Sequence, residues 1–133
     1  MGYLQILRIL KHYTMKYITF KDMLVWQKAM HVATEIFILT KSLPRAEDYG
    51  LTSQIRRAAL SVSNNIAEGF GRHNNRDKAY YYIVSRGSSF ETQNCLEYGL
   101  RVEYFKKEET NKICESLNEV IHELNKIIKT LKG

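Results

Sequence analysis

Near the C-terminus, apolar residues recur at alternating spacings of four and three positions. The series comprises Ile113, Leu117, Val120, Leu124, Ile127 and Leu131. Because an α-helix completes a turn every 3.6 residues, this spacing places all six on one side of a helix. Ile121 and Ile128 widen the stripe to the breadth of a bundle-forming side, and Glu and Lys residues cover the remainder. A helix over residues 107–132 is therefore predicted, and its apolar side must be buried against other helices.

Three other segments have the features of long helices. Residues 22–42 carry a broad apolar arc, with Asp22 as the expected N-cap and a Leu-Pro pair as the stop. The other two predicted helices span residues 51–70 and 75–102. The sequence has a single proline and seven glycines, which are too few turn-forming residues for the many turns of a β fold. Four such helices with short connections predict an all-α fold, an antiparallel up-down-up-down four-helix bundle.

The bundle domain is expected to cover residues 20–133, and residues 1–19 to form an N-terminal extension. Residues 1–14 contain five Leu or Ile and two basic residues but no acid. A signal peptide is not indicated, because the charge follows the apolar run and no small-residue cleavage site comes after it. The run is also too short to span a membrane. We expect a short helix docked on the bundle or a disordered extension, with a helix at a membrane surface as the alternative.

The predicted helix over residues 51–70 has an unusual polar side. It lacks the Lys and Glu mixture of a solvated surface and carries mostly short hydrogen-bonding groups: Gln54, Arg57, Ser61, Asn64, Asn65 and Glu68. Ser and Asn are poor helix formers, since their side chains compete for nearby backbone groups. Packing against a neighbour or recognition of a polar ligand would stabilise such a helix. We expect this polar strip to be mainly structural, with Arg57 paired to Glu68 or to a neighbouring subunit.

The same helix carries a resemblance to a known family. Residues 51–72, LTSQIRRAALSVSNNIAEGFGR, are similar to the motif of the four-helix-bundle proteins named for intervening sequences in 23S rRNA genes. The resemblance begins at residues 20–29, FKDMLVWQKA, and continues without a gap to about residue 131. Further matches are Ser85-Arg86-Gly87-Ser88, Glu91 and the Tyr104-Phe105 pair. Because two central motifs occur in the right order, the chain is identified as a member of this bacterial family.

The resemblance implies a homopentamer, in which five bundles form a ring around a central channel. The broad apolar arc of residues 22–42 fits such an assembly independently, because it is wider than a surface helix needs. More distantly, the family resembles the accessory variability proteins of diversity-generating retroelements, which bind a reverse transcriptase and nucleic acid.

The family's recurring positions correspond here to Arg56, Arg57, Asn65, Glu68, Gly69, Arg86, Gly87 and Glu91. Two residues depart from its pattern. Ser63 replaces a common proline, and Glu103 replaces the glycine that usually begins the final turn and can reshape that turn.

The whole net charge of +6 belongs to the first part of the chain. Residues 1–76 hold 11 Lys or Arg and 5 Asp or Glu, whereas residues 77–133 hold nine of each. This asymmetry fits an anionic partner, although it also serves solubility. Around residues 70–82, arginine, amide and tyrosine side chains gather, as on surfaces that contact phosphates and bases. The candidate nucleic-acid-binding residues are Arg56, Arg72, Arg76 and Lys78. The alternative for those at the turn is that they are solvated helix-end charges.

No pattern of catalytic or metal-binding residues is found. The four histidines are scattered, and none belongs to a His-x-x-x-His pair; the single Glu-x-x-His, Glu119 with His122, lacks the second such pair and the further inward carboxylates that a metal site in a bundle needs. The two cysteines, Cys95 and Cys114, match no metal-ligand spacing and favour a reducing, cytoplasmic location. We therefore expect no enzyme activity, no metal, no cofactor and no membrane partner.

The sequence thus predicts a non-enzymatic, oligomeric accessory protein that binds RNA or DNA with little base preference. Its basic surface would lie near the turn between the second and third helices. The alternative is a protein-interaction scaffold that recruits a partner such as a reverse transcriptase without itself contacting nucleic acid.

Overall fold

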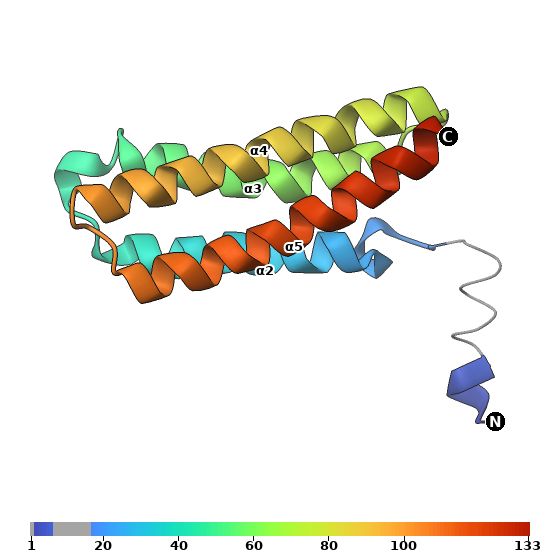
Figure 1. The fold of residues 1–133 in the computed structure, drawn as a ribbon, viewed down its shortest axis with the longest axis horizontal. Coiled ribbons are helices and arrows are strands. Elements are labelled where there is room, and N and C mark those ends of the chain that lie inside the picture. Colours follow the sequence, from blue (N-terminus) through green and yellow to red (C-terminus); the bar gives the residue numbers. More distant parts are fainter. Residues whose placement is uncertain (1, 7–16) are drawn as a thin grey trace.

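The computed structural model describes residues 2–6 and 17–133, and every regular element in these ranges is helical. Four long α-helices pack side by side as a bundle (Figure 1). They are α2 (Leu24–Leu39), α3 (Leu51–Phe70), α4 (Asn75–Arg101) and α5 (Lys107–Lys132). Three short 3₁₀ turns flank α2, namely η1 (Phe20–Asp22), η2 (Thr40–Ser42) and η3 (Arg45–Glu47). Most of the predicted N-terminal extension lies outside the described residues, and no described helix is long and apolar enough to cross a membrane.

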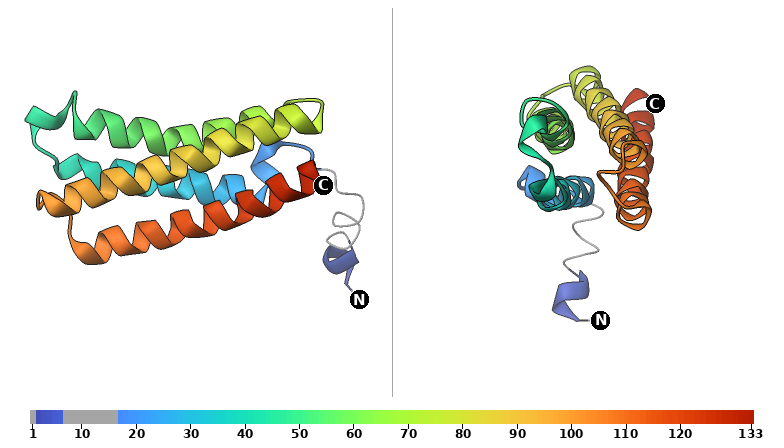
Figure 2. Two further views of the ribbon diagram at one scale, coloured as in Figure 1. Left: turned by 45° about the horizontal axis from the view of Figure 1, so that its top comes forward. Right: turned by 90° about the vertical axis from the view of Figure 1, so that its left-hand side faces the viewer.

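The helices surround a common interior when the bundle is viewed end-on (Figure 2). α3 packs against α2 and α4, and α5 packs against α4 and α2. The turn between α3 and α4 lies at the same end of the bundle as the first residues of α2 and the last residues of α5 (Figure 1). This end, called the turn end below, brings together segments that are far apart in the sequence.

The start of α2 differs from the prediction. Asp22 does not cap this helix, because its carboxylate accepts hydrogen bonds from the backbone N–H groups of Ile18 and Thr19, each at 3.0 Å, and so closes η1. The helix begins after Met23, which provides no side-chain cap. At the other end of α2, η2 carries the chain to Ser42, where the predicted helix ends. The remaining three helices have the predicted bounds to within one residue.

The apolar stripe of α5 lies in the middle of the core, as predicted. Leu117, Val120 and Leu124 have no exposed surface, because they lie inside the clusters of side chains that fill the bundle. Their neighbours in the two clusters of buried side chains include Val32, Ile36, Val62, Ile66 and Leu96. The broad apolar arc of α2 is only partly covered: Trp26 is half-buried and Phe37 remains 49% exposed.

Small residues on α4 allow α3 to approach closely. Ser85, Ser88, Ser89 and Thr92 are all buried. The hydroxyl of Ser85 donates a hydrogen bond to the carbonyl of Val62 on α3 at 2.7 Å. Because the buried hydroxyls on this side of α4 have hydrogen-bond partners, they can be buried without a large desolvation cost.

The turn from α4 to α5 has the geometry that suits a glycine, although Glu103 occupies the key position. The N–H groups of Tyr104 and Glu103 donate to the carbonyls of Gly99 and Leu100 at 2.8 and 3.1 Å, the pair of bonds that defines a Schellman helix end. Glu103 has a φ of 67°, in the left-handed region that a Cβ disfavours. The ring of Phe105 covers Gly99, where an added Cβ would lie 2.2 Å from ring atom Cδ2.

Candidate functional site

Arg72 lies just after α3 and is held by two neighbours. Its guanidinium donates hydrogen bonds to Oε1 of Glu68, at 2.6 Å from Nη2, and to the hydroxyl of Tyr81 at 2.8 Å. The guanidinium also lies 4.7 Å from the centre of the Tyr81 ring, which is a cation–π contact. The hydrogen bond to Glu68 raises the pKa of Arg72, so the side chain stays charged. Its charge is partly neutralised by the same carboxylate.

The other two basic residues of this turn have different environments. Arg76 is exposed, and its side chain has no hydrogen-bond or ion-pair partner among the described residues. Lys78 is half-buried, and its Nζ donates to the carbonyls of Gly69 and Phe70 at 3.2 and 2.8 Å. Lysine near a helix C-terminus stabilises the last carbonyls in this way. Lys78 therefore caps α3, whereas Arg76 can contact a ligand freely.

Arg56 is separated from this group. It precedes the end of α3 by 14 residues, or roughly 20 Å along the helix axis. Its Nε donates to the hydroxyl of Thr40 at 2.7 Å, and its guanidinium carbon lies 4.8 Å from the centre of the Phe37 ring. The half-buried Arg56 thus ties α3 to the end of α2.

Three further basic residues lie at the turn end and were missed by the sequence reasoning. They are Lys126, Lys129 and Lys132, in the last two turns of α5. All three are exposed, and their side chains make no ion pair or hydrogen bond with any described residue. These residues are far from the α3–α4 turn in the sequence. The fold brings the end of α5 to the same end of the bundle as that turn (Figure 1). The available signal was the predicted antiparallel order of the helices, which would bring the end of the fourth helix to that turn.

Only some residues of the polar strip of α3 form hydrogen bonds or ion pairs within the described part of the chain. The Ser61 hydroxyl hydrogen-bonds to that of Ser88 on α4 at 2.8 Å, and Asn65 Nδ2 donates to the Ser61 carbonyl at 2.8 Å. Glu68 pairs with Arg72 rather than with Arg57. The other members of the strip are exposed and have no hydrogen-bond partner among the described residues: Gln54, Arg57 and Asn64.

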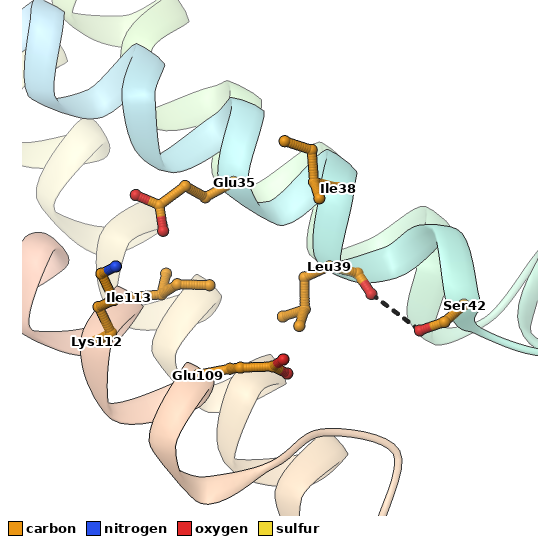
Figure 3. A pocket seen from close by; sticks show the side chains of 7 residues that line it. All are labelled: Glu35, Ile38, Leu39, Ser42, Glu109, Lys112 and Ile113. Atoms are coloured by element: carbon orange, nitrogen blue, oxygen red, sulfur yellow. Dashed lines mark hydrogen bonds between the residues drawn. The ribbon is translucent and has the colours of Figure 1, made fainter.

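A shallow pocket of about 360 Å³ lies between α2 and α5 towards the opposite end of the bundle (Figure 3). Its charged residues have mixed signs: Glu35 from α2, and Glu109 and Lys112 from α5. Glu35 contacts the imidazole of His31, one turn before it on the same helix. The Ser42 hydroxyl donates to a backbone carbonyl at 3.3 Å, so no base in the lining activates it. The lining residues of this pocket form no catalytic arrangement.

The described residues show neither a group of metal ligands nor a reactive thiol. No three His, Cys, Asp or Glu within residues 2–6 and 17–133 are placed to hold a metal ion together. Burial raises the pKa of Cys95, and a nearby Glu91 adds to the effect. Burial likewise raises the pKa of Cys114, with a contribution from Glu97. Both thiols are therefore less ionised, and less nucleophilic, than an ordinary cysteine.

Comparison with known proteins identifies relatives of this bundle. The sequence model of the family described as 23S rRNA-intervening sequence protein matches residues 21–126. A crystal structure of a protein of unknown function from the S23 ribosomal protein family of Bacteroides thetaiotaomicron is similar, with a TM-score of 0.74 and 26% sequence identity. The alignment covers 80% of this chain and 99% of that one. No curated protein matches the chain.

Proposed function

The chain belongs to the family of 23S rRNA-intervening sequence proteins, and from this premise we propose that it is a non-enzymatic, oligomeric protein that binds nucleic acid at the turn end. In this proposal, up-down-up-down bundles assemble as a homopentamer. The names of the matched family and of the neighbour's family refer to rRNA and to a ribosomal protein. Both names fit a nucleic-acid partner.

The observation that carries the proposal is the gathering of free basic side chains at the turn end. Arg76, Lys126, Lys129 and Lys132 are exposed and lack partners among the described residues. Free, exposed cations bind phosphates by displacing condensed counterions, and they need no rearrangement of internal ion pairs. Arg72 can add a phosphate contact if a ligand shares it with Glu68.

The sequence that precedes Tyr17 is also basic. Residues 1–16 hold three Lys or Arg and no acid, which is half of the net charge of +6. They join the described part at Tyr17, which lines a groove at the turn end together with Lys126. Because contacts to phosphates carry no sequence information, we expect RNA or DNA to bind with little base preference.

Exposed apolar side chains on separate faces support the oligomer. Phe37 on α2 and Leu60 on α3 are 49% and 47% exposed, and Arg56 lies over the Phe37 ring. On α4, Tyr80 and Phe90 are 60% and 54% exposed. A closed ring needs two different adhesive faces on each subunit, because its contacts are heterologous. Five copies of a weak phosphate-binding surface would also raise the affinity by multivalency.

A salt titration with charge-reversal variants tests this function. Fluorescence anisotropy with labelled RNA and DNA is measured for wild type and for the Arg76→Glu/Lys129→Glu variant. The control, Lys107→Glu/Lys112→Glu, makes the same charge change at the opposite end of the bundle. We expect at least a roughly tenfold loss of affinity and a shallower salt slope for the first variant only, because each lost phosphate contact removes about 0.9 from the slope.

Light scattering on all three proteins checks that the assembly is unchanged. A 15.6 kDa monomer at micromolar concentration would contradict the oligomer. If wild type fails to bind at low salt, or both variants lose affinity equally, the turn end is not a nucleic-acid site. The same exposed apolar faces would then favour the alternative, a scaffold that recruits a protein partner.

A further inference from the structure

An apolar groove of about 630 Å³ opens at the turn end, beside the basic residues. It is formed where the start of α2 meets the ends of α3 and α5 and the first turns of α4. Its apolar lining consists of Met23, Leu24, Val25, Phe70, Ile127 and Leu131. This volume is typical of pockets that enclose a small ligand.

Three polar side chains in the lining have no partner among the described residues. Tyr82 is 3% exposed, yet its hydroxyl has no hydrogen bond with any described residue. Glu123 and Lys126 also line the groove, and their side chains have no hydrogen bond or ion pair within the described residues. Although the Tyr82 ring is buried, its hydroxyl is not fully enclosed, so it is free to form a hydrogen bond with a ligand that enters the groove. The remaining cation, Lys78, is already bonded to the carbonyls at the end of α3.

The position of the phenol is fixed by close packing. A Cβ added to Gly69 would lie 2.8 Å from Cε1 of Tyr82, so the ring rests directly on the α3 backbone. Phe70, the next residue along α3, lines the same groove. The site therefore combines aromatic and aliphatic walls, a preset hydroxyl, one carboxylate and one free ammonium group.

This combination selects among ligands. A fatty acid would suit the walls and Lys126, but its carboxylate would meet the charge of Glu123 and it has no donor for that group. An unpaired base has an apolar face for the walls, while its edge carries both donors and acceptors. Its own phosphate would lie near Lys126. We propose that the groove receives one unstacked base of a single-stranded RNA or DNA, with the base edge bonded to Tyr82 and Glu123.

The inference rests on the proposed function and makes it more specific. A base stacked and paired in a duplex cannot enter the groove, whereas bases of loops and single strands can be turned out and held by aromatic side chains. Single strands are therefore bound more tightly than a duplex of equal charge. The phosphate contacts of Arg76 and Lys129 serve both kinds of ligand equally.

The first test compares single-stranded and duplex oligonucleotides of equal length by fluorescence anisotropy. Tyr82→Phe removes only the hydroxyl and is expected to weaken single-strand binding about three- to tenfold, the value of one hydrogen bond. Ile127→Trp fills the groove and should weaken it further. Duplex binding should be unchanged in both variants. The matched control is Tyr98→Phe, the same change at an exposed position near the other end of the same helix.

A second test observes the base directly, with a single strand that contains 2-aminopurine. Binding to wild type should change its fluorescence as the base leaves the stack, and Ile127→Trp should abolish that change. If single strands and duplexes bind alike, and Tyr82→Phe behaves as Tyr98→Phe does, the groove does not take a base although the proposed function stands. If neither ligand binds wild type, the proposed function itself fails.

Discussion

Replacing Glu103 by glycine should make this protein more stable. Glu103 has a φ of 67°, and in that region the Cβ of an L-residue costs about 1–2 kcal/mol. Glycine removes this strain but has more conformational freedom to lose on folding, which costs about 0.5–1 kcal/mol. The Glu103 side chain is exposed and has no partner among the described residues, so its loss removes no contact. The free energy of unfolding should therefore rise by about 0.5–1 kcal/mol.

Urea unfolding followed by circular dichroism, at one fixed protein concentration, measures this change. Two control variants isolate its cause. Glu103→Ala removes the same side chain but keeps the Cβ, so its stability should stay near that of wild type. Val102→Gly introduces glycine at a φ of −89°, where no strain is relieved, and should destabilise the protein. Equal stabilities of the Glu103→Gly and Glu103→Ala variants would refute the assignment of strain to this residue.

Three other changes test separate parts of the structure. Leu124→Ala should cost about 2–5 kcal/mol in urea unfolding, because the side chain is fully buried in the centre of α5. Lys78→Met should lower the stability by about 1 kcal/mol, because it leaves the carbonyl of Phe70 without its donor, whereas that of Gly69 still accepts from the N–H of Arg72. Burial raises the pKa of Tyr82 to about 12 from an ordinary value of 10.0. Because the unfolded chain ionises first, wild type should lose stability as the pH rises from 10.0 to about 12, and Tyr82→Phe should lose less over that range.

Much of the fold follows from local patterns in the sequence. The stripe from Ile113 to Leu131 predicts both the bounds and the buried side of α5, because helical periodicity and burial depend on neighbours within a few turns. The start of α2 was predicted less well, since Asp22 can cap whichever turn begins beside it. It closes η1, and the helix itself starts after Met23. Local sequence shows that a cap is present but does not decide between two adjacent turns.

The basic surface was harder to predict, because the charge of a residue says nothing about whether its side chain is already bonded. Arg56 and Lys78 are tied to Thr40 and to the end of α3, so neither offers a free cation. Conversely, Lys126 and Lys129 belong to a part of the chain whose charges balance, and the fold alone brings them to the same end of the bundle as Arg76.

The free cations at the turn end favour one path for a bound strand. A phosphate chain that contacts both Arg76 and Lys129 has to cross from the first turn of α4 to the end of α5. Lys78 and Lys126, one from each of these helices, both line the apolar groove. In the proposed function, the groove therefore lies between the two helices that carry Arg76 and Lys129, and a base turned into it would stay joined to the phosphates of the same strand. Under this proposal, a strand that crosses between α4 and α5 passes the groove and can place one base in it. Cations on the α3–α4 turn alone would not require the strand to cross there.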